Sequence, residues 1–150
     1  RCDVYTTDAS GLSSTRAQAA DPSKWLVLPE IISKEPLGPL VRHGDHQWGD
    51  VVRWSLNAMI IAEELGVSSE NVDASKSSNV PEILRLLGVE GSYGEMLELA
   101  PDWAYQIIKQ IGNYSESYEA NVGPNTPLEI ERGLNALWTN GGILYVPPFR

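Results

Sequence analysis

The sequence predicts an α/β fold in which short strands come first and helices follow. Three observations predict it: a β-branched and aromatic run at residues 2–7, apolar residues at spacings of three and four over residues 47–65, and several helix-starting patterns between residues 79 and 138. Because the strands gather in the first third of the chain, we expect their sheet partners to lie in a portion of the protein outside these 150 residues.

The first third is predicted to hold strands around one short helix. In chain order, the predicted elements are a strand (residues 2–7), a turn (8–11), a helix (12–20) and two strand pieces (25–28 and 31–32). Asp21-Pro22 is expected to end the helix, because proline lacks the backbone N–H that a helix interior needs.

The remaining two thirds are predicted to be mainly helical. The longest helix covers about residues 47–65, with Asp45 as its N-terminal cap and Gly66 at its end. Three more follow: one capped by Asn79 with Pro81 in its first turn, one over residues 101–111, and a short one over residues 114–120.

The final segment is predicted to begin with a capping box. In Thr126-Pro127-Leu128-Glu129 the Thr126 hydroxyl and the Glu129 carboxylate would satisfy exposed backbone amides, and the helix would run to about Trp138. Asn140-Gly141-Gly142 would stop it, and residues 143–146 would form a terminal extended segment.

Composition and charge exclude several classes of function. Hydrophobic residues make up 42% of the chain and charged residues 21%, as in an ordinary water-soluble domain. The net charge is -9 and basic residues do not cluster, which argues against nucleic acid or an anionic membrane as a partner. The longest apolar runs, such as residues 58–62, are far shorter than the roughly 20 residues of a membrane-spanning helix.

Known catalytic and cofactor motifs are sparse in this sequence. His43, Asp45 and His46 are the one constellation that could serve a metal-dependent or acid-base hydrolase. The favoured interpretation is a polar turn in which Asp45 caps the next helix, because a zinc site needs further ligands and Cys2 is the single cysteine. The chain has no Gly-x-Ser-x-Gly elbow and no glycine-rich phosphate loop, so we expect no cofactor and no enzymatic activity.

Two stretches in the right order resemble a known family. Residues 1–8, Arg-Cys-Asp-Val-Tyr-Thr-Thr-Asp, resemble the GR-x-DA-x-x-x-D signature of polar amino-acid-binding proteins of ABC importers. Residues 35–45, Glu-Pro-Leu-Gly-Pro-Leu-Val-Arg-His-Gly-Asp, resemble the strand and turn that re-enter the first lobe in that family. Residues 28–38, 133–142 and 147–150 are similar to the branch of general L-amino-acid receptors of the Aap and Bzt type.

The resemblance implies a type II periplasmic-binding-protein clamshell, of which this chain would be the C-terminal half with a helical extension. Residues 1–30 would end lobe two, residues 31–112 would return through a hinge strand to lobe one, and residues 113–150 would form the extension. Cys2 would pair with a cysteine in the half not present here, and the first half and any export signal would lie upstream.

The resemblance also implies a function. Asp8 would accept hydrogen bonds from the α-ammonium group of an L-amino acid, and the receptor would deliver this ligand to the membrane subunits of an ABC transporter in the periplasm. From the residues alone, Asp8 is as readily explained as a helix cap. Two alternatives stay open: the hydrolase with His43, Asp45 and His46, and a structural or interaction remnant without ligand binding.

Overall fold

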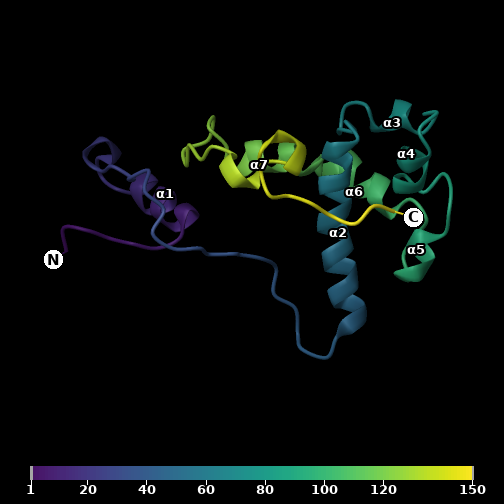
Figure 1. The fold of residues 1–150 in the computed structure, drawn as a ribbon, viewed down its shortest axis with the longest axis horizontal. Helices are drawn as coiled ribbons and strands as arrows, with labels where there is room; N and C mark the ends of the chain where they lie inside the picture. The colour runs from purple at the N-terminus through teal and green to yellow at the C-terminus, as the bar shows by residue number, and fades with distance from the viewer. Residues whose placement is uncertain (1, 150) are drawn as a thin grey trace. The chain divides into compact units, whose positions relative to one another are not determined.

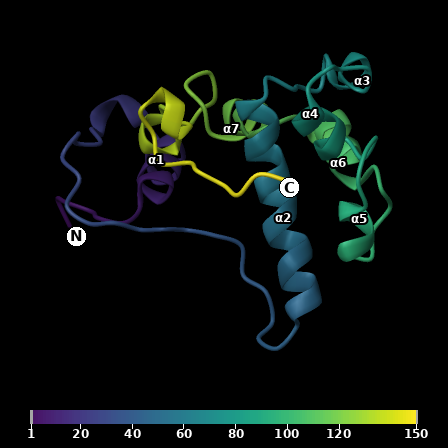
Figure 2. The ribbon, with the colours of Figure 1, turned by 45° about the vertical axis from the view of Figure 1, so that its right-hand side comes forward.

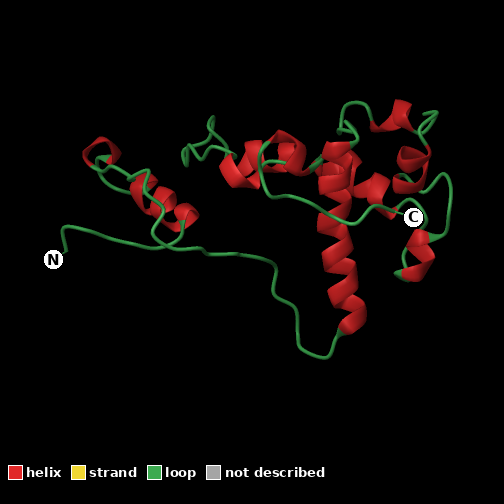
Figure 3. Ribbon diagram, in the orientation of Figure 1, coloured by secondary structure: helices red, strands yellow, loops and turns green. Residues whose placement is uncertain are grey.

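A computed structural model describes residues 2–149, and its regular secondary structure is helical (Figures 1 and 3). The α-helices are α1 (Ala9–Ala17), α2 (His46–Glu64), α3 (Val72–Ser75), α4 (Pro81–Leu86), α5 (Tyr93–Met96), α6 (Trp103–Ile111) and α7 (Tyr114–Asn121). Three 3-10 turns are added: η1 (Pro22–Lys24), η2 (Gly133–Asn135) and η3 (Trp138–Asn140).

The chain divides into two compact units. Unit 1 consists of the residues up to Gly38 together with Tyr118–Arg132, and unit 2 consists of Pro39–Ser117 together with the residues from Gly133 onward. The polypeptide therefore passes from one unit to the other three times.

Unit 2 is built around the C-terminal half of α2. Ala58, Ile61 and Ala62 of α2 are buried, and the helix packs on α6 and α4, as the two views in Figures 1 and 2 show. Ile108 of α6 and Leu87 after α4 are almost fully buried in the same core. Burial of these apolar surfaces is the main force that holds the short helices of this unit together.

A terminal segment closes the core of unit 2. Phe149 is buried, with its ring centroid 5.3 Å from those of Trp54 and Tyr93 and 6.1 Å from that of Trp103. The Arg85 side chain donates a hydrogen bond of 3.0 Å to the Phe149 carbonyl oxygen. The contacts with Tyr93 and Trp103 are edge-on, a geometry that stabilises aromatic clusters beyond the area that they bury.

Several predicted helices are confirmed. The long helix α2 begins at His46 after Asp45, whose carboxylate accepts a hydrogen bond from the Trp48 amide at 3.1 Å. Gly66 follows it with a φ of 68°, the left-handed conformation that favours glycine at a helix end. The helices expected near residues 101–111 and 114–120 correspond to α6 and α7.

Details of the other helices differ from the predictions. The first helix starts at Ala9 and not at Leu12, because Asp8 caps it. Val80, not Asn79, is the N-terminal cap of α4, and it makes no side-chain capping bond. Helices α3 and α5, of four residues each, were not predicted.

The predicted strands are wrong for the residues described. Residues 2–7, 25–28 and 31–32 contain no strand. Residues 25–41 run with mostly exposed side chains, among them Leu26, Ile31 and Ile32, each 80% exposed. A β-branched run favours an extended backbone, but a strand also requires a neighbour that accepts and donates the ladder hydrogen bonds, and none of the described segments does so here.

The helix predicted from residue 126 to 138 is also wrong. Glu129 has a φ of 52°, which interrupts a right-handed helix, and its carboxylate binds Arg16 and does not close the capping box. The Thr126 hydroxyl still accepts a hydrogen bond from the Leu128 amide at 3.2 Å. In the predicted terminal extended segment, residues 143–146, Leu144 forms an isolated parallel β-bridge with Leu137.

Candidate functional site

Asp8 lies at the start of α1 and is held by its neighbours. One carboxylate oxygen, Oδ1, accepts hydrogen bonds from the Ser10 hydroxyl at 2.5 Å and the Gly11 amide at 2.9 Å. The other, Oδ2, accepts from the Thr7 hydroxyl at 3.2 Å. The helix-cap interpretation of Asp8 is therefore confirmed, and the predicted ligand contact stays a prediction.

These hydrogen bonds keep Asp8 ionised. The bonds from Ser10 and then from the Gly11 amide lower the pKa of Asp8, and partial burial offsets them only in part. An ionised carboxylate can accept about four hydrogen bonds, so Oδ2, with one long bond from Thr7, has capacity for a further donor. An ammonium group is such a donor, and its bond to a carboxylate is stronger than a neutral one.

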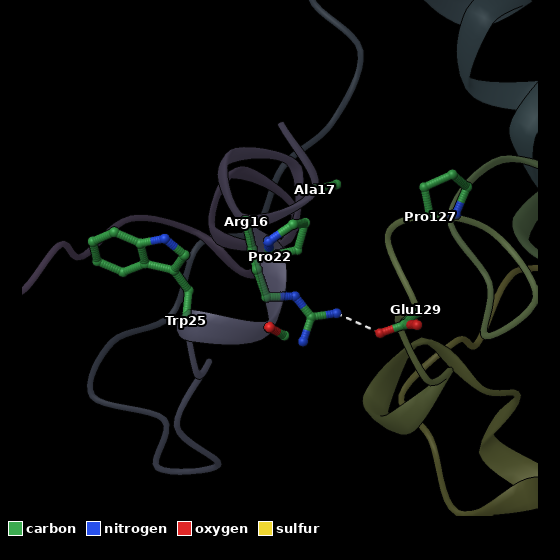
Figure 4. Close-up of a pocket in the computed structure, with 7 residues that line it drawn as sticks. Arg16, Ala17, Pro22, Trp25, Pro127 and Glu129 are labelled. Atoms are coloured by element: carbon green, nitrogen blue, oxygen red, sulfur yellow. Dashed lines mark hydrogen bonds and ion pairs between the residues drawn. The ribbon is translucent and has the colours of Figure 1, made fainter. Parts of the chain in front are cut away.

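A groove of about 480 Å³ lies in unit 1 at the other end of α1. Its walls include Arg16, Trp25, Pro127 and Glu129, and the Arg16 guanidinium lies 2.5 Å from the Glu129 carboxylate (Figure 4). Asp8 is not among the lining residues. Since α1 has nine residues that rise about 1.5 Å each, this groove is separated from Asp8 by roughly the length of the helix.

The histidines of the hydrolase alternative line a second groove, of about 380 Å³, at the start of α2. His43, Asp45 and His46 line it together with the basic Arg42 and Arg53. Asp45 is engaged as the cap of α2. Within residues 2–149, no group of three or more His, Cys, Asp and Glu side chains is arranged to hold a metal ion.

Two further expectations concern Cys2 and the membrane. Cys2 is an exposed free thiol. In the described part of the chain no helix combines the length and the apolar character needed to cross a bilayer.

One polar network was missed by the sequence analysis. The Asn113 side chain accepts a hydrogen bond from the Glu116 amide at 3.0 Å, and the Glu116 carboxylate accepts one from the Asn113 amide at 2.8 Å. The same carboxylate binds the amide and hydroxyl of Ser69, and Asn113 donates to the Val67 carbonyl oxygen at 2.9 Å. The spacing Asn113-x-x-Glu116 is the capping-box spacing and could have been recognised.

Comparison with known proteins gives the wider context for this geometry. No family model matches the chain. The chain is 55% identical to the general L-amino acid-binding periplasmic protein AapJ of Rhizobium johnstonii, over 100% of this chain and 45% of that protein. It is 54% identical to the glutamate/glutamine/aspartate/asparagine-binding protein BztA of Rhodobacter capsulatus, over 99% of this chain and 44% of that protein.

A solved structure agrees with these sequence matches. It is an ABC transporter periplasmic binding protein from Brucella ovis with glutathione bound, 51% identical, with a TM-score of 0.94 over 99% of this chain and 47% of that protein. The chain thus spans less than half the length of the relatives it matches.

The predicted family resemblance is confirmed. The chain is a homologue, over its whole length, of the amino-acid-binding proteins of ABC transporters. Its fold is that of the matching part of a periplasmic binding protein.

Proposed function

We propose that this chain is the C-terminal part of a periplasmic receptor that binds L-amino acids and delivers them to the membrane subunits of an ABC transporter. The supporting observation is the identity of 54–55% with BztA and AapJ across the whole chain. Because these relatives are named as binding proteins, a binding role, and not catalysis, is the expected activity.

In this proposal the fold is completed by the part of the receptor that the chain does not contain. The matched segment is 44–47% of each relative, and the apolar residues of the extended segment 25–41 are left exposed. The additional chain would supply the strands and the second wall of a type II clamshell. Residues 1–30 would end lobe two, residues 31–112 would return to lobe one, and residues 113–150 would form the extension.

Asp8 is the proposed ligand residue. Its ionised carboxylate would accept the ligand's α-ammonium on Oδ2, while Oδ1 continues to cap α1. The cap and the ligand contact are compatible, because the two roles use different oxygen atoms. Cys2, exposed and free here, would pair with a cysteine of the additional chain.

The ligand class follows from the chemistry that an ionised carboxylate selects. Free L-amino acids present an α-ammonium, and so does the γ-glutamyl end of glutathione, the molecule bound by the Brucella ovis relative. A carboxylate at Asp8 therefore suits both kinds of ligand. We expect L-amino acids to bind. Comparing their affinities with that of glutathione would show which of the two kinds of ligand the receptor prefers.

The test is isothermal titration of the full-length receptor with a panel of L-amino acids and glutathione. Asp8→Asn should weaken binding by about 10- to 100-fold, because a hydrogen bond to a charged group contributes about 1.5–3 kcal/mol. Asparagine is as good a helix cap as aspartate, so α1 should remain intact.

The matched control is Asp45→Asn, the same change at the cap of α2, which should leave affinity unchanged. Unaltered affinity in Asp8→Asn would remove Asp8 from the site. If no member of the panel binds the parent protein, the receptor function is contradicted. A second measurement is the intact mass of the product of the source gene: a mass of 16.5 kDa would contradict the proposal that these 150 residues belong to a larger receptor.

A further inference from the structure

The turn at residues 7–11, within unit 1, fixes the direction of the Asp8 carboxylate. Two donors, the Ser10 hydroxyl at 2.5 Å and the Gly11 amide at 2.9 Å, hold the Oδ1 atom. The Oδ2 atom accepts the longer bond, of 3.2 Å, from the Thr7 hydroxyl. Because donors hold both oxygen atoms, the carboxylate is restrained from rotating, and the position of Oδ2 is set by the turn itself.

Ser10 makes the shorter of the two bonds to Oδ1. It is the second residue of α1, and its hydroxyl donates back to the residue that caps the helix. This bond is the largest of the effects that lower the pKa of Asp8, followed by the bond from the Gly11 amide. The groups that lower this pKa are hydroxyls and backbone amides, which carry no charge. Ser10 therefore both orients the carboxylate and favours its ionised form.

Gly11 contributes through the side chain that it lacks. A Cβ atom at this position would lie 2.8 Å from Cγ2 of Thr7 and 3.0 Å from Oδ2 of Asp8. Both distances are shorter than ordinary van der Waals contact, so the Thr7 side chain and Oδ2 would have to move. Gly11 lies within α1 and does not have the left-handed φ that favours glycine. Space for Thr7 and Asp8, and not backbone conformation, is what a glycine provides here.

We infer that Ser10 and Gly11 are positioning residues for the α-ammonium group of the ligand, and that both act through Asp8. Ser10 holds Oδ1, which leaves Oδ2 for the ammonium group, and Gly11 leaves the space that Oδ2 occupies. This inference rests on the proposed receptor function, in which Oδ2 accepts a hydrogen bond from the ammonium group.

The place of Asp8 in the fold makes this positioning necessary. The start of a helix carries a partial positive charge, which disfavours a cation such as an ammonium group. An ionised carboxylate in a fixed position overcomes this effect, because its bond to a charged donor is short and strong. Loss of the Ser10 hydroxyl or of the space at Gly11 should therefore weaken binding while Asp8 itself is unchanged.

The first experiment is isothermal titration of the full-length receptor and its Ser10→Ala variant with L-glutamine, an amino acid whose side chain does not titrate. Ser10→Ala should weaken binding by about two- to tenfold at neutral pH, as expected for loss of one neutral hydrogen bond. Ser10→Thr retains the hydroxyl and should recover most of the lost affinity.

The pH dependence of affinity separates this role from a purely structural one. The pKa of Asp8 lies below its ordinary value of 3.8, so the parent should keep its affinity until the pH falls below that value. Without the Ser10 bond the pKa rises, and the affinity of Ser10→Ala should begin to fall at a higher pH. If Ser10 only supported α1, its loss would lower the affinity by the same factor at every pH.

The second experiment tests the space at Gly11. Gly11→Ala should weaken the binding of L-glutamine on the order of three- to tenfold, because small displacements of a binding group have effects of this size. Alanine favours a helix more than glycine does, so α1 amides should exchange their hydrogens no faster than in the parent. Weaker binding by an intact helix assigns the effect to the position of Asp8.

Two matched controls carry the same changes away from Asp8. Ser14→Ala removes a hydroxyl one turn further along α1, where it accepts a bond of 3.0 Å from the Gln18 side chain. Gly49→Ala adds a Cβ atom near the start of α2, where the nearest atom, Cγ2 of Val41, would be at an ordinary contact distance of 3.7 Å. Both variants should bind L-glutamine as the parent does, with the same pH dependence.

The inference is overturned if Ser10→Ala has the affinity or the pH dependence of the parent, if Ser10→Thr binds no better than Ser10→Ala, or if Gly11→Ala binds as tightly as the parent. In these cases weaker binding by Asp8→Asn would still support the receptor function, so the two failures are distinguishable. Absence of L-glutamine binding by the parent would also overturn the inference, while the wider panel of amino acids decides the receptor function.

Discussion

The two units of this chain differ in how they are held together. All buried hydrophobic residues of the described chain lie in unit 2, where they join α2, α4 and α6. Unit 1 exposes its large apolar side chains, among them Val4, Trp25, Leu28 and Ile32. Unit 2 therefore has a hydrophobic core that can stabilise it, whereas in unit 1 the described contacts are mainly local hydrogen bonds and ion pairs.

Hydrogen exchange on the 150-residue chain gives the largest expected difference. Amides of α2 and α6 should exchange on the order of a thousandfold more slowly than those of α1, because exchange in a packed core requires global unfolding and exchange in an uncovered helix does not. Mass spectrometry of peptides from the two units measures this. Equal protection in α1 and α6 would refute the contrast between the units.

Truncation of one core side chain gives the next largest effect. Ile108→Ala should lower the free energy of unfolding by about 2–5 kcal/mol, because Ile108 is fully buried and its loss leaves a cavity. The matched change Ile32→Ala, in the exposed segment of unit 1, should alter it by less than about 0.5 kcal/mol. Urea denaturation followed by tryptophan fluorescence is suitable, and comparable losses in the two variants would contradict the assignment of the core to unit 2.

Acid should destabilise unit 2 through Glu116. Partial burial raises the pKa of this carboxyl, but hydrogen bonds from Ser69 and from the Asn113 amide outweigh the burial and lower it overall. A folded-state pKa below the ordinary value of 4.5 means that the stabilisation is complete above pH 4.5 and is lost as the pH falls through the lowered pKa.

Glu116→Gln should therefore lower the free energy of unfolding by about 1–3 kcal/mol at pH 7. It should also reduce the dependence of that free energy on pH between about pH 5 and 3. Denaturation curves across this pH range measure the effect, with Glu70→Gln as the control, since Glu70 is an exposed carboxylate next to Ser69. A pH profile in Glu116→Gln that overlays that of the parent would exclude Glu116 as the source.

Substitutions of the two helix caps are expected to have the smallest effect on the free energy of unfolding. Asp45→Ala should lower the free energy of unfolding of unit 2 by about 1 kcal/mol, the usual value for loss of a capping side chain. Asp8→Ala removes the equivalent cap of α1 but should leave the unfolding free energy of unit 2 unchanged, because α1 has no core that couples it to that transition. An equal loss in both variants would show that the units unfold together.

The elements that were predicted correctly have local causes. In α2 the apolar spacing, the Asp45 cap and Gly66 are properties of neighbouring residues, and each is found as predicted. The family resemblance was likewise available from short motifs, and the similarity to AapJ and BztA confirms it. For the proposed site, the position of Asp8 at the start of a helix was predictable, and its ligand contact is untested.

The errors arise where a distant residue decides the local structure. The capping box at Thr126 and Glu129 forms only in part: Glu129 has a φ of 52°, and its carboxylate binds Arg16, 113 residues away in the sequence. The strand-like runs at residues 2–7 and 25–28 lack a partner within the described chain, so their preference for an extended backbone does not become a sheet.

The helix boundaries around Asp45 and Gly66, the acidic character of the chain and its similarity to known receptors can be read from the sequence. The sequence does not reveal that the buried apolar residues gather in unit 2, or that Glu129 pairs with Arg16 of α1. Caps and periodicity act over one or two helical turns, whereas burial and ion pairing depend on which distant segments meet.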